Sequence, residues 1–389
     1  QIVKCFRDED KRADRQPEFT QLDVEMAFPE PADVYNLIEG CVKEVMKSVL
    51  SFELSLPIPH IPYSEAMQKY GIDRPDVRFG MELSELTEFA KGCGFNAFKA
   101  VAESGGVVRA LRIPGGHELV SKGQFKNLEK DAKGRGAKGL AFLRYAPEGL
   151  DSPIAKFFSE EELQTLQKLC GAESNDLVLI LADKAKVVNG ILADYRRTYA
   201  DKAGLVAEGS YEFVWVDEFP LFEYDEETNR LYAAHHPFTA PADKEAFLAL
   251  AEEMRRTDRV CTPKIVDLAE ATKAQAYDLC FNGFELGGGS IRIHEKVVQD
   301  AMFDCLGIGP EEADAKFGFL LNALKYGAPP MGGIALGVDR FVMELLGYDN
   351  IQDVIAFPKT GGGKGLMDGS PAGVDSTLLD ELRIKVVEE

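Results

Sequence analysis

The sequence predicts an α+β fold in which an antiparallel sheet is flanked by helices and interrupted by an inserted α+β domain. Three observations support this prediction. Short alternating strands with hairpin signals dominate both ends of the chain. The middle differs, because it holds short strands and helices with many glycines. Regular βαβ alternation is absent. We therefore expect one domain in two parts, 1–77 and 206–389, on either side of an inserted domain, 78–205.

The first 28 residues carry the strongest local pattern. A loop rich in both charges, between Asp8 and Glu18, precedes a strand with one apolar and one polar face. The apolar face holds Leu22, Val24, Met26 and Phe28, and the polar face holds Gln21, Asp23 and Glu25. We expect the strand and the loop to form the floor and lid of a pocket for a charged ligand.

The segments that follow have clear boundaries. Apolar residues with a 3.6 period predict a helix over 33–52, and a proline-rich connector follows it. Ser64 is expected to cap a short helix that ends at Gly71. Glycine-rich short strands and helices between 78 and 205 are typical of a self-contained module.

Composition limits the possible environments and partners. The 389 residues are 45% hydrophobic and carry a net charge of −21, which by itself argues against nucleic acid but leaves room for a local basic face. The basic residues between 122 and 138 are expected to lie on the solvent-exposed face of a helix. Seven cysteines without a CxxC pair indicate reduced cytosolic thiols, with Cys5 and Cys280 in the core. No membrane span or signal peptide is visible, and the start at Gln1 suggests a fragment lacking its N-terminal part.

A pair of carboxylates stands out between residues 276 and 295. Asp278 and Glu285 would face opposite ways on one straight strand, but Asn282-Gly283 offers a turn or bulge that restores a common face. Two carboxylates on one face make a credible Mg²⁺ site together with phosphate oxygens.

The same stretch continues into a glycine run and an arginine. Glycines 287–289 allow close approach of a ligand or another backbone, and Arg292 then lies on a polar strand face where it can grip a carboxylate. A glycine bulge followed by a surface arginine is the alternative interpretation.

Three weaker signals remain. In GGIALGVDRF, Asp339 is placed to cap a helix and Arg340 to lie in its first turn, although a plain strand–turn–helix explains the same pattern. The pair His235-His236 follows a strand. Taken alone, it is expected to be structural, and a zinc site is disfavoured. The glycines before Lys364 read as a mobile loop rather than a phosphate loop.

Together these motifs resemble the class II aminoacyl-tRNA synthetases, and within them the bacterial-type aspartyl-tRNA synthetases. FRDEDKRADRQPEFTQLDVE resembles motif 2, GIALGVDRF resembles motif 3, and AHHPFTAP and GFELGGGSIRIH resemble segments particular to the aspartyl branch. The resemblance covers essentially the whole chain. It implies a class II antiparallel sheet, with a bacterial-type insertion at 78–205.

The resemblance also implies roles for individual residues. Arg7 and Arg340 would be the catalytic cations. Contacts to ATP would come from Arg7, Asp8, Glu9, Gln16, Glu285, Gly337, Val338, Asp339 and Arg340. Aspartate would be bound by Arg7, Asp23, His235 and Arg292, with assistance from His236. Asp278 and Glu285 would bind Mg²⁺.

The implied activity is ATP-dependent ligation of L-aspartate to tRNA(Asp) through aspartyl-adenylate, in the cytoplasm, by a protein that is a homodimer when full length. Two alternatives stay open: an enzyme that also charges tRNA(Asn), and a non-catalytic relative that binds nucleotide or tRNA. The family's motif 1, its anticodon-binding barrel and a segment that closes over aspartate are expected upstream of Gln1, so this fragment could itself be inactive.

Overall fold

The structure is a computed structural model that describes residues 1–8 and 12–387. The chain divides into two compact units. Unit 1 comprises Gln1–Glu25 and Gly333–Glu389, and unit 2 comprises Met26–Gly332. The predicted α+β class with antiparallel sheets is confirmed, whereas the predicted boundaries at 78 and 205 stay a prediction.

Unit 1 contains strands β1 (Ile2–Phe6), β2 (Glu18–Ala27) and β14 (Met331–Gly337) in that spatial order, although β2 and β14 each run past the unit boundary. Strands β1 and β2 form an antiparallel hairpin in which Phe6 pairs with Glu18. Helices α13 (Val338–Leu346) and α14 (Ser376–Leu382) and the 3-10 turn η2 (Ile351–Val354) complete the unit.

The alternation of β2 ends one residue earlier than the sequence predicted. Phe28 is 73% exposed and has a φ of 57°, because the chain leaves the sheet there before helix α1 (Pro31–Leu50). Cys5 is only half-buried in the edge strand β1, so its assignment to the core was wrong, whereas Cys280 is fully buried.

Unit 2 begins with α1, which confirms the predicted helix. Pro31 occupies its first turn and Glu30 forms a capping box with Asp33. The apolar stripe Val34, Ile38, Val42 and Met46 is buried. The next short helix, α2 (Tyr63–Lys69), has Pro62 rather than Ser64 at its N-cap, so the prediction of a Ser64 cap was wrong.

The main sheet of unit 2 has the order β13-β12-β9-β3. Strands β12 (Ala276–Phe281), β13 (Phe284–Ile291) and β9 (Phe213–Asp217) pair antiparallel, and β3 (His60–Pro62) adds a parallel edge. Helices α9 (Lys244–Arg256), α10 (Pro263–Ala271) and α11 (Lys296–Leu306) supply much of the core that packs with this sheet. The hairpin β10 (Phe222–Asp225) and β11 (Arg230–Ala233) and helix α12 (Pro310–Leu324) complete this part.

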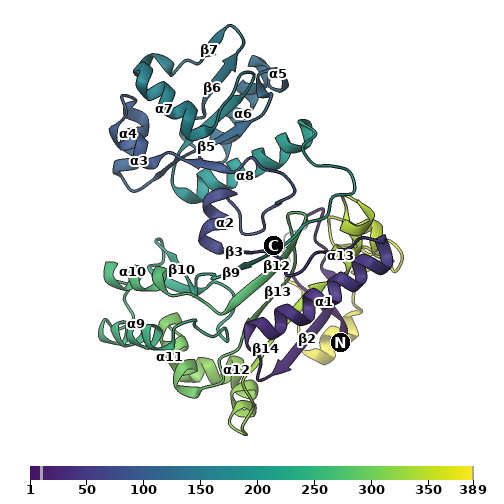
Figure 1. Ribbon diagram of the computed structural model, residues 1–389. Helices are drawn as coiled ribbons and strands as arrows, with labels where there is room; N and C mark the ends of the chain where they lie inside the picture. The colour runs from purple at the N-terminus through teal and green to yellow at the C-terminus, as the bar shows by residue number, and fades with distance from the viewer. Residues whose placement is uncertain (9–11, 388–389) are drawn as a thin grey trace. The chain divides into compact units, whose positions relative to one another are not determined.

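A second, five-stranded sheet lies between residues 83 and 183, in the order β4-β5-β8-β6-β7. Its strands are β4 (Leu83–Glu85), β5 (Val107–Ile113), β6 (Ala141–Ala146), β7 (Gly149–Asp151) and β8 (Leu177–Asp183). The helices around it are α3 (Thr87–Gly92), α4 (Asn96–Glu103), α5 (Gly116–Leu119), α6 (Lys122–Gly134), α7 (Glu160–Cys170) and α8 (Ala185–Lys202) (Figure 1).

The apolar run of β8 follows from burial on both faces. Leu177, Leu179 and Leu181 join one core, which includes residues of α8, while Val178 and Ile180 join another. A strand covered on both sides has no polar face, which is why this segment shows no alternation in the sequence. The separate sheet and cores are consistent with the predicted inserted domain.

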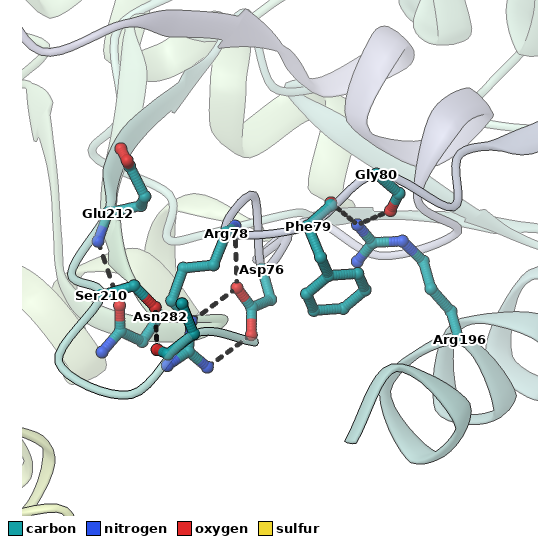
Figure 2. A network of polar contacts seen from close by, with 9 residues as sticks. Asp76, Arg78, Phe79, Gly80, Arg196, Ser210, Glu212 and Asn282 are labelled. Carbon is teal, nitrogen blue, oxygen red and sulfur yellow. Dashed lines mark hydrogen bonds and ion pairs between the residues drawn. The ribbon is translucent and has the colours of Figure 1, made fainter. Parts of the chain in front are cut away.

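A buried arginine joins α8 to the connector that precedes this sheet. The Arg196 guanidinium donates hydrogen bonds to the carbonyls of Phe79 and Gly80 at 3.0 and 2.9 Å (Figure 2). It also donates to the Met81 carbonyl at 3.1 Å. It also lies over the rings of Tyr70 and Phe79. Burial lowers the pKa of Arg196 to about 10, which leaves it charged at neutral pH.

No helix in the described residues is long and apolar enough to cross a membrane.

Candidate functional site

The β1–β2 hairpin of unit 1 carries Arg7 at the start of its charged loop. The Arg7 backbone N–H donates to the Pro17 carbonyl at 3.0 Å, which closes the base of the loop. Its guanidinium lies 5.3 Å from the centroid of the Phe19 ring, a cation–π contact that orients the side chain. Asp8 is exposed beside it, and Glu9 lies outside the described residues.

Gln16 is buried at the other end of the loop, where its Oε1 accepts the backbone N–H of Lys359 at 2.9 Å. The Lys359 ammonium approaches Glu18 at 3.5 Å and donates to Ser370 Oγ at 3.1 Å. A cavity of about 470 Å³ opens beside these residues and is lined in part by Arg7, Asp8, Glu18, Lys359 and Ser370. Unit 1 thus offers a recess bordered by two cations, Arg7 and Lys359.

Helix α13 places Arg340 in its first turn, as predicted. Its Nη2 lies 3.2 Å from the Asp14 carbonyl and 3.3 Å from Asp14 Oδ2. This ion pair offsets the unfavourable position of a cation at a helix N-terminus. The predicted cap was wrong: Gly337 is the N-cap, and Asp339 Oδ2 instead accepts the Thr20 N–H of β2 at 2.6 Å. The helix begins at Val338, two residues too early for Asp339 to cap it.

Asp23 lies half-buried on β2 in the same unit. Its backbone N–H donates to the Gln1 carbonyl at 2.8 Å, and its carbonyl accepts from the Gln1 ammonium at 2.7 Å. These two bonds continue the antiparallel pairing of β1 with β2, so the backbone of Asp23 is held in the sheet.

The hairpin β12–β13 of unit 2 brings Asp278 and Glu285 together. Asn282 and Gly283 form its turn, both with positive φ, so Cys280 pairs with Glu285 and the predicted common face is confirmed. A bulge at Leu279/Cys280 then sets Asp278 opposite Gly288. A Cβ at Gly288 would lie 2.5 Å from Asp278 Oδ1 and 3.5 Å from Glu285 Oε1, so both carboxylates converge over this glycine.

The electrostatics of this pair fit a divalent cation. Burial, the neighbouring Glu285 and then Asp73 raise the pKa of the Asp278 carboxyl well above its usual value. Two converging carboxylates that repel each other are stabilised by a bound cation, and carboxylate oxygens with phosphate oxygens are the ligands Mg²⁺ prefers. The residues present therefore fit Mg²⁺.

Arg292 lies just beyond β13 and faces a loop formed by His236, Pro237 and Phe238. Its Nη1 donates to the buried Ser290 Oγ at 2.6 Å and lies 2.9 Å from His236 Nε2. Backbone pairing between Thr239 and Arg292, and between Ile293 N–H and the Phe238 carbonyl at 2.7 Å, holds the loop against the strand end.

The His236 ring also contacts its own loop, where Nδ1 accepts the Phe238 backbone N–H at 3.1 Å. Burial first, then Arg292 and His235, lowers the pKa of His236 to about 4, so the ring is neutral at pH 7. The ring is thus fixed between the Phe238 N–H on one side and the Arg292 guanidinium on the other.

His235 has different surroundings from its neighbour. Its ring packs edge-on against Phe219 at 4.8 Å between centroids. Desolvation lowers its pKa, and Asp73 opposes that shift. Of the two histidines, it is His236 that contacts Arg292.

The structure thus brings the predicted residues together in two groups, one in each unit. Arg7, Asp8, Gln16, Asp23 and the start of α13 belong to unit 1. Asp278, Glu285, His235 and Arg292 belong to unit 2. The sequence analysis missed four participants: Asp14, Lys359, Ser290 and Asp73. Only Ser290 had a usable signal, because it shares a strand face with Arg292 at a spacing of two.

Curated proteins resemble the chain over nearly its whole length. An aspartate–tRNA ligase of Macrococcus caseolyticus is 49% identical over 386 residues, which is 99% of this chain and 62% of that protein. Aspartate–tRNA(Asp/Asn) ligases of Bacillus cytotoxicus and Aquifex aeolicus are 46% and 47% identical, over 99% and 100% of this chain and 63% of each relative. The chain therefore spans a little over three fifths of the length of these relatives.

Among solved structures, an asparaginyl-tRNA synthetase of Entamoeba histolytica in complex with asparaginyl-adenylate aligns with a TM-score of 0.42 and 15% identity. The alignment covers 92% of this chain and 52% of that one. A family model described as tRNA synthetases class II (D, K and N) matches residues 1–361. Because that match includes all but the last 28 residues, the chain belongs to the class II tRNA synthetases (D, K and N).

Proposed function

We propose that this protein ligates L-aspartate to tRNA(Asp) at the expense of ATP. The observation that carries the proposal is the Arg292 guanidinium, held at the end of β13 by contacts with Ser290 and His236, because a positioned guanidinium matches the side-chain carboxylate of aspartate. The names of the relatives, at 45–49% identity over nearly the whole chain, support the same reaction.

The first step joins aspartate to ATP. An oxygen of the aspartate α-carboxylate attacks the α-phosphorus, and diphosphate leaves with the electrons of the broken P–O bond. The transition state gains charge on phosphate oxygens, so it needs positioned cations rather than a general base. We assign this role to Arg7 and Arg340, with Gln16 and the start of α13 holding the nucleotide.

Asp278 and Glu285 would hold Mg²⁺, which would neutralise the charge of the ATP phosphates. Asp23 would receive the substrate ammonium, because it presents a carboxylate on the polar face of β2. In the second step, a terminal ribose hydroxyl of the tRNA attacks the activated carbonyl carbon, and AMP leaves.

Specificity against asparagine follows from charge. Asparagine is nearly isosteric with aspartate, but its side-chain amide is neutral and half of it is itself a donor. The Arg292 guanidinium presents donors only, so the carboxylate is favoured and the amide nitrogen is repelled. We expect Arg292→Ala to lower aspartate-dependent ATP–diphosphate exchange by at least about a hundredfold, a loss of roughly 3 kcal/mol of binding to a charged group.

The decisive test is ATP–diphosphate exchange with aspartate and, separately, asparagine. Exchange that depends on aspartate and is lost in Arg292→Ala supports the proposal. ATP binding without exchange in the full-length protein would favour a non-catalytic relative. Normal discrimination in Arg292→Ala would show that specificity lies elsewhere.

A second candidate, charging of both tRNA(Asp) and tRNA(Asn), is favoured by the Asp/Asn ligase names of several relatives. Charging assays with both tRNAs distinguish the two.

We also propose that the protein is cytoplasmic, since tRNA is charged where translation occurs, and that it is a homodimer, as the resemblance implies. Residues 78–205 are proposed to form an insertion domain. Sedimentation tests the homodimer, and limited proteolysis tests the insertion domain.

A further inference from the structure

A buried glutamine of α11 is bonded to the loop that carries His236. Gln299 is 3% exposed, and its Nε2 donates to the Pro237 carbonyl at 2.8 Å. Because a carbonyl oxygen can only accept, this contact fixes which end of the carboxamide faces Pro237. The side chain therefore has a single orientation.

The other end of this carboxamide is unfavourable for stability. Gln299 Oε1 is buried and has no hydrogen-bond partner among the described residues. A buried acceptor without a partner destabilises the fold, and an apolar side chain of the same length would avoid that cost. Gln299 lies on the buried face of α11, where Val298 and Met302 are apolar. Stability alone does not explain a glutamine here.

The hydrogen bond from Gln299 to Pro237 fixes the loop directly beside His236. Pro237 has no N–H, so its carbonyl is the one backbone hydrogen-bonding group it offers. One residue before it is His236, whose Nδ1 accepts from Phe238 and whose Nε2 faces Arg292. One residue after it, the Phe238 ring packs edge-on against Phe303 of α11 and Phe317 of α12. Movement of Pro237 would turn His236 away from Arg292.

We propose that Gln299 is a positioning residue that holds the Pro237 carbonyl so that His236 keeps the Arg292 guanidinium directed at the carboxylate of the substrate. The role rests on the proposed function, because the substrate is taken to be aspartate. Gln299 does not touch the substrate. It sets the affinity for aspartate through the geometry of the loop.

The first test separates this role from a structural one. Gln299→Met keeps the length of the side chain and removes both polar atoms. We expect the purified protein to unfold at an equal or higher urea concentration, while KM for aspartate in ATP–diphosphate exchange rises roughly three- to tenfold and kcat changes less, as loss of one neutral hydrogen bond implies. Val297→Ala, at an exposed neighbouring position of α11, serves as control and leaves both quantities unchanged.

The second test asks whether Gln299 acts through His236. His236→Gln is combined with Gln299→Met, and KM for aspartate is measured for both single variants and the double variant. If Gln299 only positions His236, adding Gln299→Met to His236→Gln raises KM by less than about twofold. Fully multiplicative effects would overturn the proposal.

The outcomes also separate this inference from the proposed function. Absence of aspartate-dependent exchange in the unmodified full-length protein, in which all variants are tested, overturns the proposed function. Normal exchange in the unmodified protein with an unchanged KM in Gln299→Met overturns the role of Gln299 alone. A lower urea midpoint in Gln299→Met with an unchanged KM shows that the residue is structural, and it overturns the role as well.

Discussion

The His236 ring nitrogen Nε2 lies 2.9 Å from Nη1 of Arg292, and Nδ1 of the same ring accepts the Phe238 N–H at 3.1 Å. The ring is therefore fixed between its own loop and the arginine. This contact links the conformation of the loop to the position of the Arg292 guanidinium.

Protonation of His236 is expected to destabilise the protein in acid. Its pKa is lowered to about 4 in the folded chain from about 6.5, so the unfolded chain binds more protons between these values and stability falls as pH drops through them. His236→Gln should remove about 1–3 kcal/mol of the loss in unfolding free energy between pH 7 and pH 4. Urea unfolding at several pH values measures this, with the exposed His294→Gln as control. Equal slopes for His236→Gln and the unmodified protein would contradict the lowered pKa of His236.

Gly288 is expected to tolerate no side chain. An added Cβ would lie 2.5 Å from Asp278 Oδ1, so the buried carboxylate must move away from Glu285. Gly288→Ala should reduce aspartate-dependent exchange at least about tenfold, equivalent to roughly 1.4 kcal/mol, with an unchanged circular dichroism spectrum. Gly139→Ala, where nothing lies within 4 Å of the new Cβ, is the matched control. Full activity in Gly288→Ala would show that the two carboxylates do not act together.

Mg²⁺ is expected to stabilise the folded protein through Asp278. The pKa of Asp278 is raised, so the folded state binds more protons than the unfolded state above pH 3.8, and stability falls as pH rises toward the raised value. At pH 7, Asp278→Asn should therefore be more stable than the unmodified protein by about 1–2 kcal/mol without Mg²⁺. Millimolar Mg²⁺ should raise the melting temperature of the unmodified protein but not of Asp278→Asn.

The control for this prediction is Asp267→Asn, which removes an exposed carboxylate elsewhere in unit 2. It should leave the Mg²⁺ response intact. The same rise in melting temperature in Asp278→Asn would place the cation away from the hairpin.

Local patterns were enough to predict much of this fold. The 3.6 period predicted α1 within two residues, and the Asn282-Gly283 turn was sufficient to bring Asp278 and Glu285 to one face. Both predictions depend on interactions between residues close in sequence. The continuous apolar run of β8 was not identified individually as a strand, because burial on both faces removes the alternation that marks one.

The contacts that tune the candidate site could not be predicted in this way. Asp14 meets Arg340 across 326 positions of sequence, and Gln16 meets Lys359 across 343. Gln299 appears in the sequence as one polar residue in an amphipathic helix, and only its distance to Pro237 marks it as different. The choice of His236 rather than His235 as the neighbour of Arg292 likewise depends on the loop conformation after β11.

Arg196 is expected to be the strongest single contributor to the junction between α8 and the connector at residues 79–81. Replacing it with Met removes the donors to three backbone carbonyls, and a methionine side chain cannot supply them. Arg196→Met should lower the free energy of unfolding by about 2–5 kcal/mol, because buried carbonyls lose their partners. The neighbouring Arg197→Met, an exposed arginine that lies over the Phe284 ring, should cost about 0.5–1 kcal/mol. Urea unfolding compares the two variants, and limited proteolysis should show faster cleavage near residue 80 in Arg196→Met alone. Equal losses in both variants would mean that the carbonyl contacts add nothing beyond the packing of an arginine stem.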